Sequence, residues 1–136
     1  MIAERTNGVR KEVKNWLDSA QYDLETAQDM FNTGRYIYTV FMCHLALEKM
    51  LKAKMEEVTD KTPPKTHDLE YLVGLAGLSP DQEREKFIAE ISNLSVVTRY
   101  PSDFQMIFND FSRERVEIIF TKTKEVFQWI EKSLSF

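Results

Sequence analysis

The hydrophobic pattern of residues 34–55 predicts a helix that the rest of the chain packs around. Its apolar side chains return every three or four residues, the spacing of one helix face. They are Ile37, Phe41, Leu47, Leu51 and Met55, with Val40 and Leu45 beside them. An apolar stripe of this length indicates a core-facing helix.

Three polar residues lie on the same stripe. His44 and Glu48 are one helical turn apart, Lys52 follows one turn later, and Lys49 lies beside them. Side chains of these types are not buried in a core unless something pairs them. Two interpretations stay open, because the residues can satisfy one another or can face a cleft between helices.

Helical spacing recurs in three more long segments. Apolar residues repeat every three or four positions over residues 9–32, 79–97 and 112–134, and a shorter helix after His67 would bury Leu69, Leu72 and Val73. Gly34 ends the first segment in a tight turn, which places the first two helices side by side and antiparallel. Pro63 and Pro64 interrupt residues 56–66, which we expect to form a loop.

Capping residues mark several of the expected helix starts. Ser79 and Gln82 are spaced as a capping box, with a proline between them at the first helical position. Ser112 is placed to cap the last helix, and Asp68 or Thr66 to cap the short one. Residues 98–110 are too apolar for a loose loop, so we expect them to pack on the bundle or on a second copy of the chain.

Composition agrees with a helical protein. The chain has 136 residues, which fits one domain over residues 1–136, and its polar residues 1–8 are expected to be frayed. Four glycines and four prolines are few turn formers for this length, so the elements must be long. We therefore predict an all-α fold: an up-and-down bundle of four long helices plus one short helix.

Charge, cysteine content and hydropathy reduce the number of possible classes of function. A net charge of −4 argues against binding nucleic acid mainly through charge. The single cysteine, Cys43, excludes an intrachain disulfide and is expected to be buried and inert. The chain lacks an apolar run of about 20 residues and lacks a signal peptide at its N-terminus, so we expect a cytoplasmic protein that does not enter a membrane.

No familiar catalytic or metal-binding motif occurs in the sequence. It lacks a P-loop, a dinucleotide-binding fingerprint, a CxxC and an HExxH, and its two histidines lack the spacing of metal ligands. We therefore expect no metal and no cofactor. The candidate binding residues are polar side chains on the second helix and at the helix junctions: His44, Glu48, Lys49, Lys52, His67, Arg99 and Tyr100.

These candidates have a functional and a structural interpretation. Arg99 and the lysines are suited to hold phosphate, and Tyr100 to stack on a base. In the structural interpretation His44 and Glu48 are a buried pair, the lysines are solvated, and Arg99 clamps Glu48 or a helix end. The sequence does not decide between the two.

At these residues the chain resembles the HEPN (higher eukaryotes and prokaryotes nucleotide-binding) family. The resemblance covers about residues 10–130 and rests on four segments in a fixed order. They are Trp16-Leu17 with Ala20, Asp23, Leu24 and Ala27; Gly34 and Tyr36 leading to Cys43-His44 and Leu47-Glu48-Lys49 with Lys52; Thr66-His67-Asp68-Leu69 with Leu72; and Arg99-Tyr100-Pro101.

The resemblance implies a helical bundle that is usually a homodimer and often pairs with a minimal nucleotidyltransferase in a two-component, toxin–antitoxin-like system. Many members are metal-independent ribonucleases with an arginine followed after four to six residues by a histidine. Here the arginines are at positions 5, 10, 35, 84, 99, 113 and 115, and no histidine follows any of them at that spacing. Arg99 matches the family's arginine, but its histidine is missing.

The first hypothesis is therefore a module that binds a nucleotide or RNA and a nucleotidyltransferase partner, without catalytic residues of the usual kind. The alternative is a ribonuclease toxin with a rearranged site, in which Arg99 meets His44 or His67 in space. A third possibility is a purely structural interaction subunit. The sequence leaves open whether the protein is an enzyme.

Overall fold

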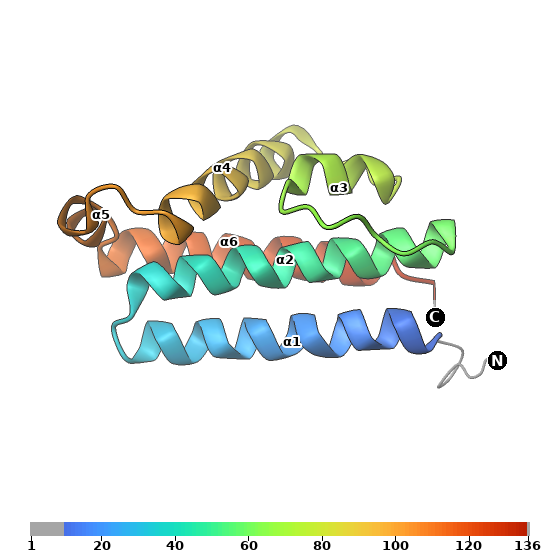
Figure 1. Ribbon diagram of the computed structural model, residues 1–136, viewed down its shortest axis with the longest axis horizontal. Coiled ribbons are helices and arrows are strands. Elements are labelled where there is room, and N and C mark those ends of the chain that lie inside the picture. Colours follow the sequence, from blue (N-terminus) through green and yellow to red (C-terminus); the bar gives the residue numbers. More distant parts are fainter. Residues whose placement is uncertain (1–9, 136) are drawn as a thin grey trace.

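The computed structural model describes residues 10–135, which form six helices (Figure 1). These are α1 (Lys11–Asn32), α2 (Tyr36–Thr59), α3 (Leu69–Leu75), α4 (Gln82–Arg99), α5 (Phe104–Asp110) and α6 (Arg113–Lys132). The described residues contain no strand. The prediction of an all-α bundle is confirmed, whereas the prediction of frayed residues 1–8 lies outside the described part of the chain.

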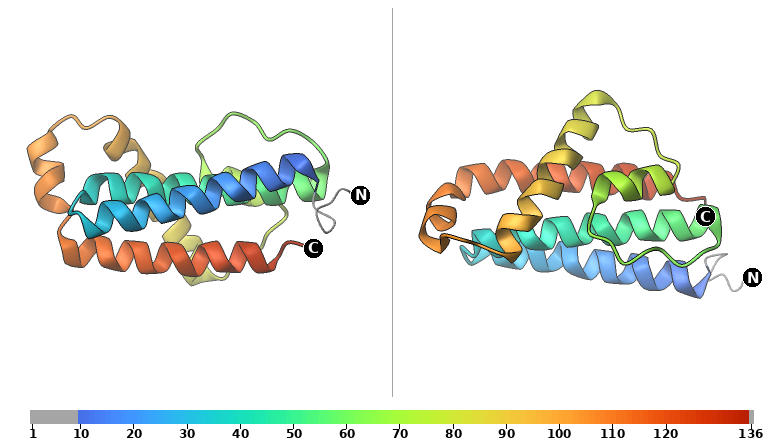
Figure 2. Two further views of the ribbon diagram at one scale, coloured as in Figure 1. Left: turned by 90° about the horizontal axis from the view of Figure 1, so that it is seen from below. Right: turned by 45° about the horizontal axis from the view of Figure 1, so that its top comes forward.

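The four long helices alternate in direction. Figure 1 shows α1 and α2 as an antiparallel pair, joined by a turn in which Gly34 has a φ of 78°. That left-handed conformation is readily accessible to glycine, as the sequence predicted. α6 lies along α2 and α1, while α4 crosses over α2 at an incline, with α3 beside it (Figure 2). α2 contacts all five other helices and is the centre of the bundle.

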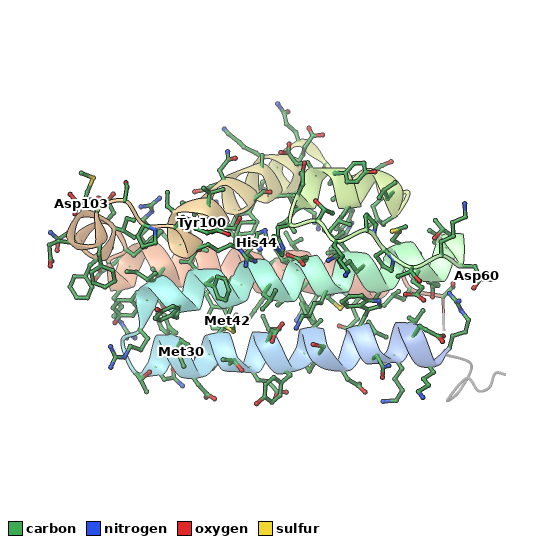
Figure 3. The ribbon with its side chains drawn as sticks, in the orientation of Figure 1. Met30, Met42, His44, Asp60, Tyr100 and Asp103 are labelled. Carbon is green, nitrogen blue, oxygen red and sulfur yellow. The ribbon has the colours of Figure 1, made fainter. Side chains whose placement is uncertain are left out.

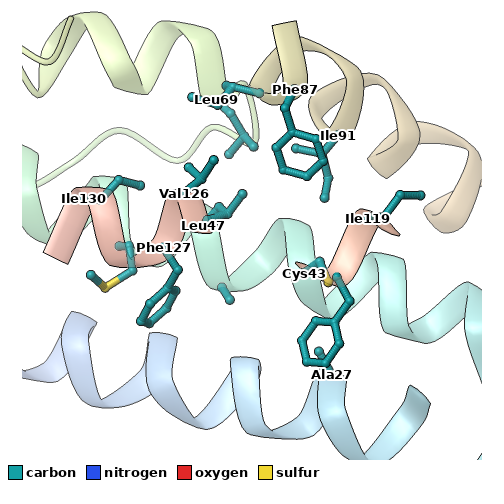
Figure 4. Close-up of a cluster of buried hydrophobic side chains, with 14 of the residues drawn as sticks. Ala27, Cys43, Leu47, Leu69, Phe87, Ile91, Ile119, Val126, Phe127 and Ile130 are labelled. Carbon is teal, nitrogen blue, oxygen red and sulfur yellow. The ribbon is translucent and has the colours of Figure 1, made fainter. Parts of the chain in front are cut away.

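The apolar stripe of α2 is the centre of the core. Leu47 and Cys43 meet side chains from α1, α3, α4 and α6, including Ala27, Leu69 and Ile91 (Figure 4). Cys43 is fully buried, and this burial raises the pKa of its thiol to about 12. A thiol with a raised pKa forms the reactive thiolate less readily, and the expectation that Cys43 is buried is confirmed.

Two helix boundaries differ from the sequence prediction. α2 does not end near Met55 but continues to Thr59, because Glu56 is buried against α1, where it accepts a hydrogen bond from Trp16 Nε1 at 3.0 Å. The start of α4 is capped by Asp81 instead of Ser79, since the Asp81 carboxylate accepts from the N–H of Arg84. Asp68 and Ser112 cap α3 and α6 as predicted.

Residues 98–110 contain a helix that the sequence analysis did not assign. α5 follows Pro101 and is capped by Asp103. Phe111, just after it, is buried, but Phe104, Met106 and Phe108 are more than half exposed. Packing of the whole segment onto its own bundle is therefore not observed. None of the described helices is long and apolar enough to cross a membrane.

Candidate functional site

Glu48 lies at the centre of a buried polar cluster on α2. Only 4% of the residue is exposed. Its Oε2 atom accepts a hydrogen bond from Lys52 Nζ at 3.0 Å, and its Oε1 atom lies 2.9 Å from Nδ1 of His67. A buried carboxylate is tolerated only when such partners offset its loss of hydration. The cluster thus joins two turns of α2 to the loop that precedes α3.

His44, one turn before Glu48 on α2, holds the backbone of the same loop. Its Nε2 atom lies 3.0 Å from the backbone carbonyl oxygen of His67. A carbonyl only accepts, so Nε2 carries the proton of the neutral ring. Burial lowers the pKa of His44 to about 4, and the charge of Glu48 opposes this shift only in part. At neutral pH His44 is therefore an uncharged donor.

His67 has one face in the cluster and one in solvent. Its Nδ1–H donates to Glu48, while 59% of the side chain is exposed. The loop backbone is held by His44, and the ring is oriented by the carboxylate. A histidine held by a carboxylate through Nδ1 keeps its Nε2 atom free to accept a proton. This exposed imidazole is the part of the cluster best placed to meet a ligand.

Arg99 reaches the cluster from the last turn of α4, where that helix crosses α2. Its guanidinium carbon lies 4.7 Å from the centre of the Phe41 ring, and its Nη2 atom lies 4.0 Å from Glu48 Oε1. The Nε and Nη2 atoms are buried without a hydrogen-bond partner among the described residues. Phe41 was assigned only to the apolar stripe, so sequence reasoning missed its role as a platform for this arginine.

The remaining candidates from the sequence are Tyr100, Lys52 and Lys49. Tyr100 caps α4 and is 77% exposed; Figure 3 labels it with His44 where α4 crosses over α2. Lys52 is buried, bonded to Glu48, and its ammonium lies 5.5 Å from the centre of the Trp16 ring. Lys49 turns to α1, where its Nζ lies 2.8 Å from Asp23. Both lysines therefore have carboxylate partners inside the protein.

The structure brings His44, Glu48, Lys52, His67 and Arg99 together and leaves Lys49 and Tyr100 outside the ion-paired cluster. Glu48 is the one carboxylate among these five residues and it bonds to Lys52, so Arg99, 4.0 Å away, has no carboxylate of the described residues within hydrogen-bond distance. A guanidinium in that position favours an anionic ligand. The described residues contain no group of three His, Cys, Asp or Glu side chains able to hold a metal ion.

Comparisons with known proteins agree with this fold. A family model described as HEPN domain matches residues 13–133. Among solved structures, the crystal structure of TT1696 from Thermus thermophilus superposes with a TM-score of 0.74 at 20% sequence identity. The superposition covers 92% of this chain and 100% of that chain, and it shows a shared fold. A search of curated proteins found no match.

The burial of neutral His44 predicts a pH-dependent stability. The ordinary pKa of 6.5 applies to the unfolded chain and about 4 to the folded one, so between these values the unfolded chain binds a proton that the folded chain does not. Above pH 6.5 the protonation of His44 therefore does not change the free energy of unfolding. As the pH is lowered from 6.5 to about 4, it lowers the free energy of unfolding by about 3 kcal/mol.

Urea unfolding at several pH values measures this effect. His44→Gln keeps a donor for the His67 carbonyl but cannot be protonated, so its free energy of unfolding should fall less steeply between pH 6.5 and 4. Equal slopes for the two proteins would contradict the assignment of a buried neutral imidazole.

Proposed function

Because the chain belongs to the HEPN domain family, we propose that it binds a nucleotide or RNA at the face formed by Arg99, Tyr100 and His67, and that it pairs with a minimal nucleotidyltransferase. The pairing is supported by family membership alone. A nucleotidyltransferase gene beside the gene for this chain, and a complex of the two purified proteins, would support it further.

The observation that carries the binding proposal is that Arg99 has no carboxylate within hydrogen-bond distance in the described part of the chain. Lys52 already bonds to Glu48 at 3.0 Å, whereas Arg99 Nη2 lies 4.0 Å from that carboxylate and its guanidinium lies over the Phe41 ring. One fifth of the Arg99 side chain is exposed, and because Nε and Nη2 are buried, a phosphate would approach the remaining guanidinium nitrogen, Nη1. Tyr100, next to Arg99 in the sequence and largely exposed, offers a ring on which a base can stack.

Replacement of Arg99 tests this proposal. Titration with ATP, GTP and a short RNA should give measurable affinity for at least one of them, and Arg99→Gln should weaken it about tenfold or more, the effect of losing one charge-assisted contact. Arg113→Gln is the matched control, since Arg113 also lies over a phenylalanine ring, Phe31, but on another helix. Equal losses in both variants, or no binding at millimolar ligand, would count against the proposal.

A second candidate function is RNA cleavage without a metal, and the orientation of His67 favours it. The Glu48 carboxylate holds Nδ1–H, which leaves Nε2 to take the proton of a ribose 2′-hydroxyl. The 2′-oxygen would then attack the adjacent phosphorus, and the 5′-oxygen would leave with a proton from the imidazolium or from water. Arg99 would stabilise the charge that develops on the phosphate.

This second function predicts RNA cleavage that persists in EDTA and is lost in His67→Gln. Arg99→Gln should lower the rate as well, whereas Tyr71→Phe, on the exposed surface of α3, should not change it. Cleavage that survives in His67→Gln would show a contaminant or another site.

We also propose that two copies of the chain associate through α5. Phe104 and Phe108 stack with ring centres 6.1 Å apart, and both are more than half exposed, as are Met106 and Tyr38. Gly34, Tyr36 and Ile37 line a shallow groove with the two phenylalanines. Exposed apolar side chains gathered in this way are typical of a protein–protein interface.

The association predicts a dimer in solution at micromolar concentration. Phe108→Asp should convert it to a monomer, because a buried, unpaired carboxylate is costly at an interface. Tyr71→Asp changes an equally exposed aromatic residue on α3, a helix that lies away from α5 (Figure 1), and should leave the dimer intact. Analytical ultracentrifugation distinguishes the two states, and a monomeric wild-type chain would refute the association.

A further inference from the structure

We propose that Glu48, His44 and Arg99 bind one water molecule between α2 and the end of α4. The inference goes beyond the proposed function and does not depend on it. It starts from two buried polar groups, Nδ1 of His44 and Nη2 of Arg99, that lie near the same oxygen atom, Oε1 of Glu48.

The distances to Oε1 are too long for direct hydrogen bonds. Nδ1 of His44 lies 3.8 Å away and Nη2 of Arg99 lies 4.0 Å away. Direct N–H···O bonds measure about 2.7–3.2 Å. Separations slightly longer than this between polar atoms are those at which one water commonly bridges the two groups.

The protonation of the cluster determines which of these groups can donate and which can accept. His44 carries its proton on Nε2, which donates to the His67 carbonyl, so Nδ1 is an acceptor. Glu48 Oε1 accepts from His67 and has a second lone pair. Nδ1 and Oε1 therefore face each other as two acceptors, and neither can donate to the other.

Arg99 provides the opposite type of group. Its Nε–H and one Nη2–H share an edge of the guanidinium, and both nitrogen atoms are buried without a partner among the described residues. A water molecule donates two hydrogen bonds and accepts two. It can donate to Nδ1 and Oε1 and accept from the Arg99 edge, which satisfies every group at once.

Other small ligands fit less well. A cation would face the guanidinium, and an anion would face a carboxylate and an imidazole lone pair. A ligand hydroxyl has one proton and would leave one of the two acceptors unpaired. Buried waters typically make about three hydrogen bonds to groups that lack protein partners. The chemistry of the site therefore selects water.

The water would connect Arg99 to Glu48 through hydrogen bonds. The last turn of α4 is then attached to α2 by stacking on Phe41 and by hydrogen bonds through one water. A direct bidentate ion pair would fix the same arginine more firmly.

Two substitutions of His44 separate the water from the loop contact. In His44→Asn the amide oxygen replaces Nδ1 as an acceptor, whereas the bond to the His67 carbonyl is lost. In His44→Gln the amide nitrogen replaces Nε2, so the loop contact stays and the acceptor towards the water is lost. Crystal structures of the wild type and both variants, without nucleotide and at a resolution that shows ordered water, test the proposal.

We expect a water within hydrogen-bond distance of Glu48 Oε1, His44 Nδ1 and Arg99 in the wild type and its retention in His44→Asn. In His44→Gln we expect its loss or markedly lower occupancy. A direct Arg99–Glu48 bond in the wild type, or equal occupancy in both variants, would overturn the proposal. Nitrogen-detected NMR of His44 gives an independent check, since a ring protonated on Nδ1 would also overturn it.

Discussion

The buried carboxylate of Glu48 is the interaction on which the rest of the site depends. Lys52 comes from its own helix, His67 from the loop before α3, and Arg99 from the end of α4. Lys52 and His67 bond to Glu48 directly, and removing such a partner from a buried charge destabilises a protein by about 3–5 kcal/mol. Glu48 thus fixes the loop before α3, whereas Arg99 lies 4.0 Å from it and over the Phe41 ring.

This constraint explains why the polar cluster lies inside an otherwise apolar bundle. Apolar packing determines that α4 crosses α2, through residues such as Leu47 and Ile91, but it does not fix which polar side chains meet there. The hydrogen bond from His44 to the His67 carbonyl adds that specificity. Neutral His44 makes this contact without adding a second positive charge beside Arg99. Arg99 is the one cation that the end of α4 brings to this cluster, and part of its side chain reaches solvent.

Much of the fold could be predicted from the sequence because apolar spacing and capping residues are local signals. The stripe of α2 with His44, Glu48 and Lys52, the turn at Gly34 and the cap at Ser112 all follow from residues within a few positions. The direction of Lys49 towards Asp23 depends on which side of α2 faces α1 in space. The continuation of α2 beyond Met55 similarly depends on Trp16, 40 positions away from Glu56.

The site also differs from the family's motif because its candidate groups come from segments that are far apart in sequence. A motif with an arginine and a histidine a few residues apart places both groups on one segment, so a search for spacing finds them. Here Arg99 and His67 come from different segments, and Glu48 is the neighbour that both share. Phosphate chemistry requires the two groups to be close in space and correctly oriented, whatever their separation in sequence. The missing motif therefore says little about the capacity of this site, whereas the contacts of Glu48 bear on it directly.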